Sequence, residues 1–254
     1  MTQARRVGMI GFTLAVALAA VTAAAPPAIA ADSKAHNLYL LAAKLFEQDK
    51  NDDAIAALIK AIQLQPEFPD AYHLLGQVYF EGKRRPSDAI TALKQAIQQK
   101  PDFAQAHYHL GLVYQAQGKF ADAEQMLRRA IQISLKYEEA YWVLARQFQR
   151  NRLNDKAIQV YQDLLAINPN HTGALYSLAV IYDGQGDTGK AREALERLTK
   201  ADPSHPDGWY LMGRIEEKEN NLAKATDAYR MAVAAKPDLV DAHYNLAFLY
   251  RSEG

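Results

Sequence analysis

The seven histidines are the side chains of this sequence best suited to proton transfer or metal binding. A metal site on one helix needs a second ligand one turn away, at i+4. His107 and His109 are two residues apart, so a helix directs them to different faces, and neither has a histidine or an acidic residue at i+4. The sequence has no cysteine, no Gly-x-Ser-x-Gly motif and no His-Glu-x-x-His motif. We therefore expect a protein that is not an enzyme and that holds neither a metal nor a cofactor.

Five prolines mark the elements that must position these residues. They are 35, 68, 34 and 34 residues apart, and each closes a stretch in which apolar residues recur at helical spacing. A period of about 34 residues with two helices per unit is typical of a repeat array, in which each unit buries its apolar face only against its neighbours. The sequence therefore predicts an all-α protein. The prolines are Pro66, Pro101, Pro169, Pro203 and Pro237.

Small residues recur at two places in each unit, where we expect two helices to approach closely. In the second helix the residue is alanine; in the first it is alanine or glycine directly after leucine or methionine. Larger residues complete an apolar stripe at i, i+3, i+4 and i+7. His107 and His243 stand at an aromatic position of that stripe and are expected to be buried, whereas His171 and His205 belong to turns between units. The small residues are Ala54, Ala89, Ala123, Ala157, Ala191 and Ala225, and Ala42, Gly76, Gly111, Ala145, Ala179, Gly213 and Ala247.

The segments Tyr72-His73-Leu74-Leu75-Gly76-Gln77-Val78-Tyr79 and His109-Leu110-Gly111-Leu112-Val113-Tyr114 resemble the tetratricopeptide repeat family. The resemblance covers residues 35–254, after a short tail at 31–34. It implies a right-handed α-solenoid of six full repeats plus a terminal helix. The implied repeats are 35–68, 69–103, 104–137, 138–171, 172–205 and 206–239, with a partial repeat at 240–254.

The resemblance also implies a concave groove lined by the first helices. In this family the residue after the aromatic core position points into the groove, and here each unit places a ring there. Such rings bind an extended peptide or a helix of a partner protein at small entropic cost. The alternative, routine packing of the rings within the solenoid, stays open. The groove residues are Tyr39, His73, Tyr108, Trp142, Tyr176, Tyr210 and Tyr244.

Charged residues farther along the same face differ between early and late units. Glu47 and Glu81 come early, whereas the late units carry Arg146 with Arg150 and Arg214 with Lys218. Each cation could stack on the ring of its own helix, or the arginines could receive carboxylates of a partner. Nearby acids offer a third possibility, neutralisation within the chain. These acids are Glu138, Glu139, Asp183, Asp207 and Glu217.

Three places depart from the repeat. One extra residue precedes Ala89, which predicts that the turn over residues 81–86 bulges outward. Leu135 stands where other units place proline, which predicts that the helix before it runs on. The terminal helix has no second helix, which predicts that Phe248 is exposed on the groove side and available for self-association.

The first 30 residues have a different composition. Arg5 and Arg6 precede an apolar run over residues 7–25, and Ala28-Ile29-Ala30 follows a proline pair, which is typical of a secretory signal peptide. We expect cleavage after Ala30 and export to a bacterial periplasm. A retained membrane anchor is the alternative, because the run approaches the length of a span.

Without those residues the chain has 27 Lys and Arg against 29 Asp and Glu, a net charge of −2. That balance argues against nucleic-acid binding, which needs a basic surface. The sequence therefore predicts a non-enzymatic scaffold or adapter of the cell envelope that binds envelope proteins or peptides and does not insert into the membrane after cleavage. The alternatives are a homo-oligomeric scaffold joined through its last helix, and a non-catalytic accessory subunit of an envelope enzyme or export machine.

Overall fold

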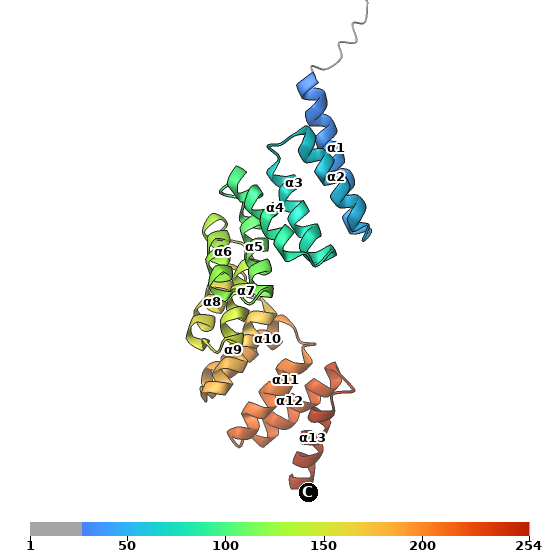
Figure 1. Cartoon of the computed structure of the whole chain (residues 1–254). Coiled ribbons are helices and arrows are strands. Elements are labelled where there is room, and N and C mark those ends of the chain that lie inside the picture. The colour runs from blue at the N-terminus through green and yellow to red at the C-terminus, as the bar shows by residue number, and fades with distance from the viewer. Residues whose placement is uncertain (1–26, 254) are drawn as a thin grey trace, which may run out of the picture.

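The computed structural model of the chain describes residues 27–253, and the side chains of residues 32–251. Over that range the chain forms helices joined by short turns, without a strand (Figure 1). The helices are α1 (Pro27–Glu47), α2 (Asn51–Leu64), α3 (Pro69–Gln77), the π-helix η1 (Val78–Gly82), α4 (Pro86–Gln99), α5 (Ala104–Ala116), α6 (Phe120–Ile133), α7 (Glu138–Arg150), α8 (Asn154–Ile167), α9 (Thr172–Gln185), α10 (Thr188–Ala201), α11 (Pro206–Lys218), α12 (Leu222–Ala235) and α13 (Val240–Glu253).

The helices form a solenoid. Each odd-numbered helix from α1 to α11 packs against the next helix as a hairpin, and α13 packs against α12. The hairpins follow one another along an elongated, curving array from α1 to α13 (Figure 1). The predicted all-α solenoid of helix pairs with a terminal helix is confirmed.

The small residues are where the helices of each hairpin meet. All six predicted alanines of the second helices are fully buried. A Cβ atom at Gly76 would lie 2.6 Å from Leu93 Cγ, and one at Gly213 would lie 2.6 Å from Tyr229 Cδ1. These separations are too short for carbon atoms, so glycine permits the close approach of α3 to α4 and of α11 to α12.

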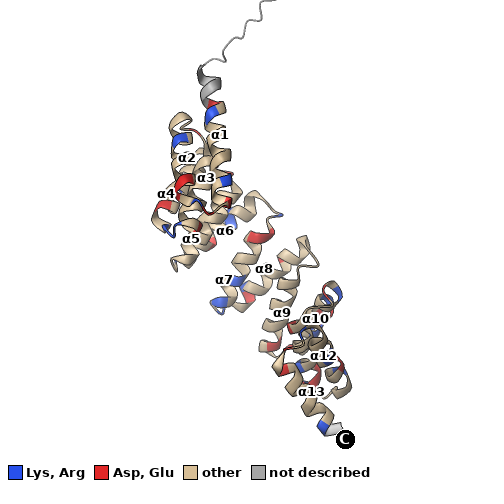
Figure 2. Ribbon diagram, turned by 90° about the vertical axis from the view of Figure 1, so that its right-hand side faces the viewer, with Lys and Arg blue, Asp and Glu red and all other residues tan. Residues whose placement is uncertain are grey.

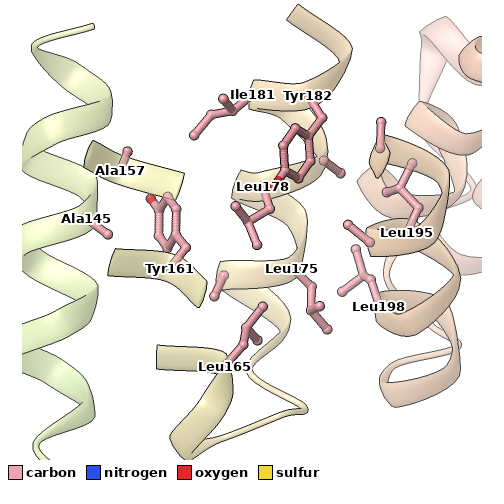
Figure 3. Close-up of a cluster of buried hydrophobic side chains, with 14 of the residues drawn as sticks. Ala145, Ala157, Tyr161, Leu165, Leu175, Leu178, Ile181, Tyr182, Leu195 and Leu198 are labelled. Atoms are coloured by element: carbon pink, nitrogen blue, oxygen red, sulfur yellow. The ribbon is translucent and has the colours of Figure 1, made fainter. Parts of the chain in front are cut away.

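The core runs along the array between the hairpins. Its largest part extends over α6 to α12 and includes Tyr161, Leu175 and Leu195, which have no exposed surface. Figure 3 shows Tyr161 of α8 between α7 and α9, with Leu195 of α10 on the far side of α9. Each layer therefore packs against the layers before and after it, as a repeat array requires.

The prediction that a helix runs on through Leu135 is wrong. Helix α6 ends at Ile133, Leu135 is 69% exposed in the following turn, and α7 begins at Glu138. The Ser134 backbone N–H donates to the carbonyl of Ala130, and the Tyr141 hydroxyl donates to that of Leu135 at 3.4 Å. Packing of the next hairpin therefore fixes the end of α6 without a proline.

The extra residue near position 81 is accommodated within the helix end. Residues 78–82 form one π-helical turn directly after α3. A π-turn holds one more residue than an α-turn, and such turns commonly absorb single insertions. The Arg85 backbone N–H donates to the Tyr79 carbonyl at 2.7 Å, which ties the rest of the turn back to η1. The extra residue is therefore taken up by a π-turn at the end of the first helix.

The predicted signal peptide lies mostly outside the described residues. Of residues 1–30, only 27–30 are described, and they form the start of α1. None of the helices between residues 27 and 253 combines the length and the apolar character needed to cross a bilayer.

Candidate functional site

The ring residues of the first helices form a ladder along one face of the solenoid. We call the seven predicted groove residues the ring ladder: Tyr39, His73, Tyr108, Trp142, Tyr176, Tyr210 and Tyr244. The first six are half-buried, and Tyr244 on α13 is 72% exposed. First helices of successive repeats also contact each other, α3 with α5 and α9 with α11. Because first helices approach each other in this way, they line the inner face of the array.

A second row of rings supports the ladder, and sequence analysis did not find it. These cap rings are the residues directly before the next first helix. Each ladder ring from the first repeat to the fifth lies against the cap ring 29 or 30 residues later. The centroid distances are 5.3 Å for Tyr39–Phe68, 4.8 Å for His73–Phe103, 5.1 Å for Tyr108–Tyr137, 5.1 Å for Trp142–His171 and 5.4 Å for Tyr176–His205.

Two of the cap rings also hold the helix that follows them. The backbone N–H of Ala174 donates to His171 Nδ1 at 3.1 Å, and that of Gly208 donates to His205 Nδ1 at 3.0 Å. Each imidazole therefore acts as an N-cap acceptor, a role more often taken by Ser, Thr, Asp or Asn. Because an acceptor nitrogen carries no proton, the cap requires Nδ1 to be the unprotonated ring nitrogen of each histidine.

His73 and His109 from adjacent repeats form a hydrogen-bonded pair in the groove. His73 Nε2 lies 3.0 Å from His109 Nδ1, which also lies 2.8 Å from the Gln105 carbonyl. The Gln77 side-chain amide donates to His109 Nε2 at 2.9 Å. If Nε2 accepts, Nδ1 of His109 carries the proton and His73 Nε2 is an acceptor. Burial, followed by repulsion from a charge on His109, lowers the pKa of His73 to about 3, and burial also lowers the pKa of His109.

Three tyrosines of the ladder, Tyr39, Tyr108 and Tyr176, remain protonated hydroxyls. Burial is the main cause that raises the pKa of Tyr39, Tyr108 and Tyr176. An acidic residue in the first turn of the next first helix adds to the effect: Asp70, Glu139 and Asp207, in the same order. The inner face therefore presents neutral phenols that can donate a hydrogen bond to a carbonyl of a bound chain.

The predicted cations of the groove have different surroundings. The Arg146 guanidinium lies over the Trp142 ring, 5.4 Å from its centroid, as the stacking alternative predicts. No matching contact joins Arg214 to Tyr210 among the described side chains. Lys218 Nζ on α11 instead forms an ion pair with Asp183 on α9, in the preceding repeat. Arg146, Arg150 and Arg214 are exposed.

Two of the other acids considered as neutralising partners accept hydrogen bonds from groups other than the groove cations. Glu138 accepts from the Asn168 amide at 2.8 Å, and Glu217 accepts from the Tyr229 hydroxyl at 2.8 Å.

A hollow of about 320 Å³ between α11 and α13 is lined by Arg214, Glu217, Lys218 and Asn245. Figure 2 shows acidic and basic residues interspersed along the whole array.

A third set of rings anchors four of the first helices, α5, α7, α11 and α13, to the turns before them. His107 Nε2 lies 3.0 Å from the Pro101 carbonyl, and the Trp209 indole N–H donates to the Pro203 carbonyl at 2.8 Å. His107 is 6% exposed, which confirms its predicted core position. The prediction that His243 is buried is wrong: it lies 2.9 Å from the Pro237 carbonyl but is exposed, because no described helix follows α13 to cover it.

The remaining candidate residues bring no catalytic group together. Phe248 is 50% exposed on α13. Gly184, Gly186 and Gly189 have the spacing of a phosphate-binding loop, but they join two helices, and Asp187 already caps α10 by accepting from the Lys190 backbone N–H at 3.1 Å. Across the described residues no three His, Asp or Glu side chains gather in a way that could hold a metal ion.

The repeats of this sequence match models of known protein families. Four family models described as tetratricopeptide repeat or TPR repeat match residues 43–82 and 87–118, 70–102, 104–140 and 151–215. The chain belongs to the tetratricopeptide repeat family. A comparison with curated proteins gave no match.

Several solved tetratricopeptide structures share the fold. A crystal structure of MamA is 26% identical, with a TM-score of 0.59, over 64% of this chain and 94% of that one. YrrB, described as a TPR protein with an unusual peptide-binding site, is 21% identical with a TM-score of 0.61, over 74% and 97%. The C-terminal part of a TPR repeat-containing protein from Cytophaga hutchinsonii is 16% identical with a TM-score of 0.73, over 85% and 88%.

Proposed function

We propose that this protein is a non-enzymatic scaffold of the bacterial cell envelope that binds a segment of a partner protein along its ring ladder. The observation that carries the proposal is the pairing of each ladder ring with a cap ring through five successive repeats. Rings that are already fixed lose little side-chain freedom when a ligand binds, so more of the contact energy contributes to affinity.

The chemistry of the inner face fits a polypeptide ligand. Neutral phenols can donate to backbone carbonyls, and the rings supply apolar area for side chains. Arg146, Arg150 and Arg214 are exposed and can receive acidic side chains of the same segment. The peptide-binding site named for YrrB supports this reading by analogy of fold.

Export is part of the same proposal and rests on the sequence. The paired arginines, the apolar run over residues 7–25 and the Ala28-Ile29-Ala30 site support a secretory signal cleaved after Ala30. The N-terminal sequence of the protein recovered from the periplasmic fraction would test this directly. A chain that begins at residue 1 and stays with the membrane would support the retained anchor.

Photo-crosslinking in the intact envelope tests the groove. A photoreactive phenylalanine derivative replaces Trp142 or Tyr210, and the control places it at Lys94, which is exposed on the second helix α4. We expect a discrete adduct with another protein at both ladder positions and none at Lys94. Equal labelling at all three positions, or no adduct at the ladder, would refute groove binding.

Self-assembly through α13 is the second candidate, because Tyr244 and Phe248 are both exposed there. In that case the ladder positions would give only adducts between two copies of the chain. The mass of the mature protein in sedimentation equilibrium would rise with concentration, and Phe248→Ser would abolish that rise.

A further inference from the structure

A cleft on the outer side of the solenoid, formed by α8, α9 and α10, is set apart from the ladder. Its volume is about 430 Å³, within the usual range of small-molecule sites. Leu165, Leu178 and Ala194 form its floor, and Lys190, Glu193 and Arg197 stand at its rim. We call it the outer cleft.

The preceding repeat contains an equivalent but smaller cleft. Its volume is about 160 Å³, and every residue that lines it corresponds to an outer-cleft residue 34 residues later. The lining side chains of the two clefts can therefore be compared position by position.

Loss of bulk explains the larger volume. Tyr141 of the smaller cleft becomes Leu175, Val160 becomes Ala194 and Gln132 becomes Ala166. Leu175 takes the anchoring position that a ring occupies in the repeats on either side, as Tyr141 and Trp209. The fifth repeat thus lacks the ring that its neighbours supply from within the chain.

The missing ring also changes the polar group at that position. In the neighbouring repeats the ring donates to the backbone carbonyl six residues earlier. In the fifth repeat that carbonyl, of Pro169, accepts instead from the Arg197 guanidinium at 3.2 Å. Arg197 replaces Asp163 of the smaller cleft, so a base stands where the preceding repeat has an acid, and its guanidinium takes the place of the missing ring as donor to the carbonyl.

Two other charged residues, Lys190 and Glu193, stand at the rim of the outer cleft. Lys190 lies over the Tyr182 ring, 5.5 Å from its centroid, and forms an ion pair with Asp187 at 2.8 Å. Glu193 is the carboxylate of the rim. Arg197 uses one N–H on Pro169, and a guanidinium has further N–H groups to offer a ligand.

We propose that the outer cleft binds a small aromatic carboxylate, whose ring covers the apolar floor where the neighbouring repeats place their own ring and whose carboxylate pairs with Arg197. The size of the cleft, the absent ring and the exchange of an acid for arginine all point to this class of ligand. The site is independent of the ring ladder.

Binding of 4-fluorophenylacetate to the full chain, followed by its ¹⁹F line position and width, tests the proposal. We expect a saturable change with the wild-type protein. Leu175→Tyr restores the ring found in the neighbouring repeat and should abolish binding, and its helical circular dichroism spectrum shows whether the variant is folded. Ala194→Val provides a second variant that narrows the cleft in the same way.

Charge variants separate the ring from the carboxylate. Arg197→Gln should weaken binding about tenfold, the effect of losing one charge-assisted hydrogen bond, and Glu193→Gln should strengthen it. Tyr141→Leu alone should not create a second site in the preceding repeat, because Asp163 stands there in place of Arg197. A wild-type spectrum that does not change, or unchanged binding by folded Leu175→Tyr, would overturn the site. Equal binding of neutral 4-fluorobenzyl alcohol would overturn the pairing with Arg197.

Discussion

Acidification should weaken the solenoid first at the histidine pair between the second and third repeats. His73 has an ordinary pKa of 6.5 and a pKa of about 3 in the folded protein. Between these values the unfolded chain binds a proton that the folded chain excludes. The free energy of unfolding therefore falls as pH falls from about 6.5 toward about 3, and is restored as pH rises.

The size of the effect follows from the two pKa values. Linkage gives a loss of about 2 kcal/mol between pH 8 and pH 5 for His73 alone. The full difference of the two values corresponds to an upper limit of about 5 kcal/mol, reached below pH 3. His109 shifts in the same direction and adds to the loss. The hydrogen bonds give the structural reason. A proton added to His73 Nε2 would place its N–H group against the N–H group of His109 Nδ1.

Urea denaturation at pH 8 and pH 5 measures this difference. The reference variant is His73→Tyr, because Tyr39, Tyr108 and Tyr176 occupy the same ladder position and a tyrosine keeps the ring without titrating in this range. We expect the wild type to lose about 2 kcal/mol more than the variant. Equal losses in both proteins would refute the assignment of the pH dependence to His73.

The remaining predictions concern packing and one buried carboxylate. Gly213→Ala should lower the unfolding free energy by about 1–3 kcal/mol, because the added Cβ atom meets the Tyr229 ring. Gly184→Ala should raise the unfolding free energy by about 0.5–1 kcal/mol, because the space around Gly184 is open and alanine favours a helix. Thermal denaturation compares the two variants. Arg192→Ala should cost about 3 kcal/mol, because Glu216 is 3% exposed and loses the guanidinium 2.7 Å away. Adding Glu216→Gln should recover part of that cost in the same assay, and no recovery would contradict the explanation.

The architecture was predictable because the repeat determines it. Buried alanines and glycines recur with the period, so their spacing alone places the helix contacts. The ladder position could be identified for the same reason. Leu135 could not be recognised as a turn residue from the proline spacing, because α6 ends at Ile133 without a proline.

Contacts between repeats were harder to predict. The partner of His109 does not lie one turn away on the same helix; it is His73, 36 residues earlier in the adjacent repeat. The cap rings were missed because they lie in turns, outside the helical stripe. One signal was available: an aromatic residue or histidine stands before five successive first helices. The outer cleft needed a comparison of equivalent residues across two repeats.

Two irregularities of the chain meet at the junction between the second and third repeats. The repeats on either side of it contain the extra residue, the π-turn and the histidine pair. His109 stands where three other repeats have Leu74, Val143 and Leu211 and the fifth has Ser177, so a polar network takes the place of the apolar contact found in those three. Such a network fixes geometry only while every partner is satisfied. Hydrogen exchange at pH 5 should therefore accelerate in α3 and α5 before it does in α9 and α11. Uniform acceleration along the array would show that the junction has no special sensitivity.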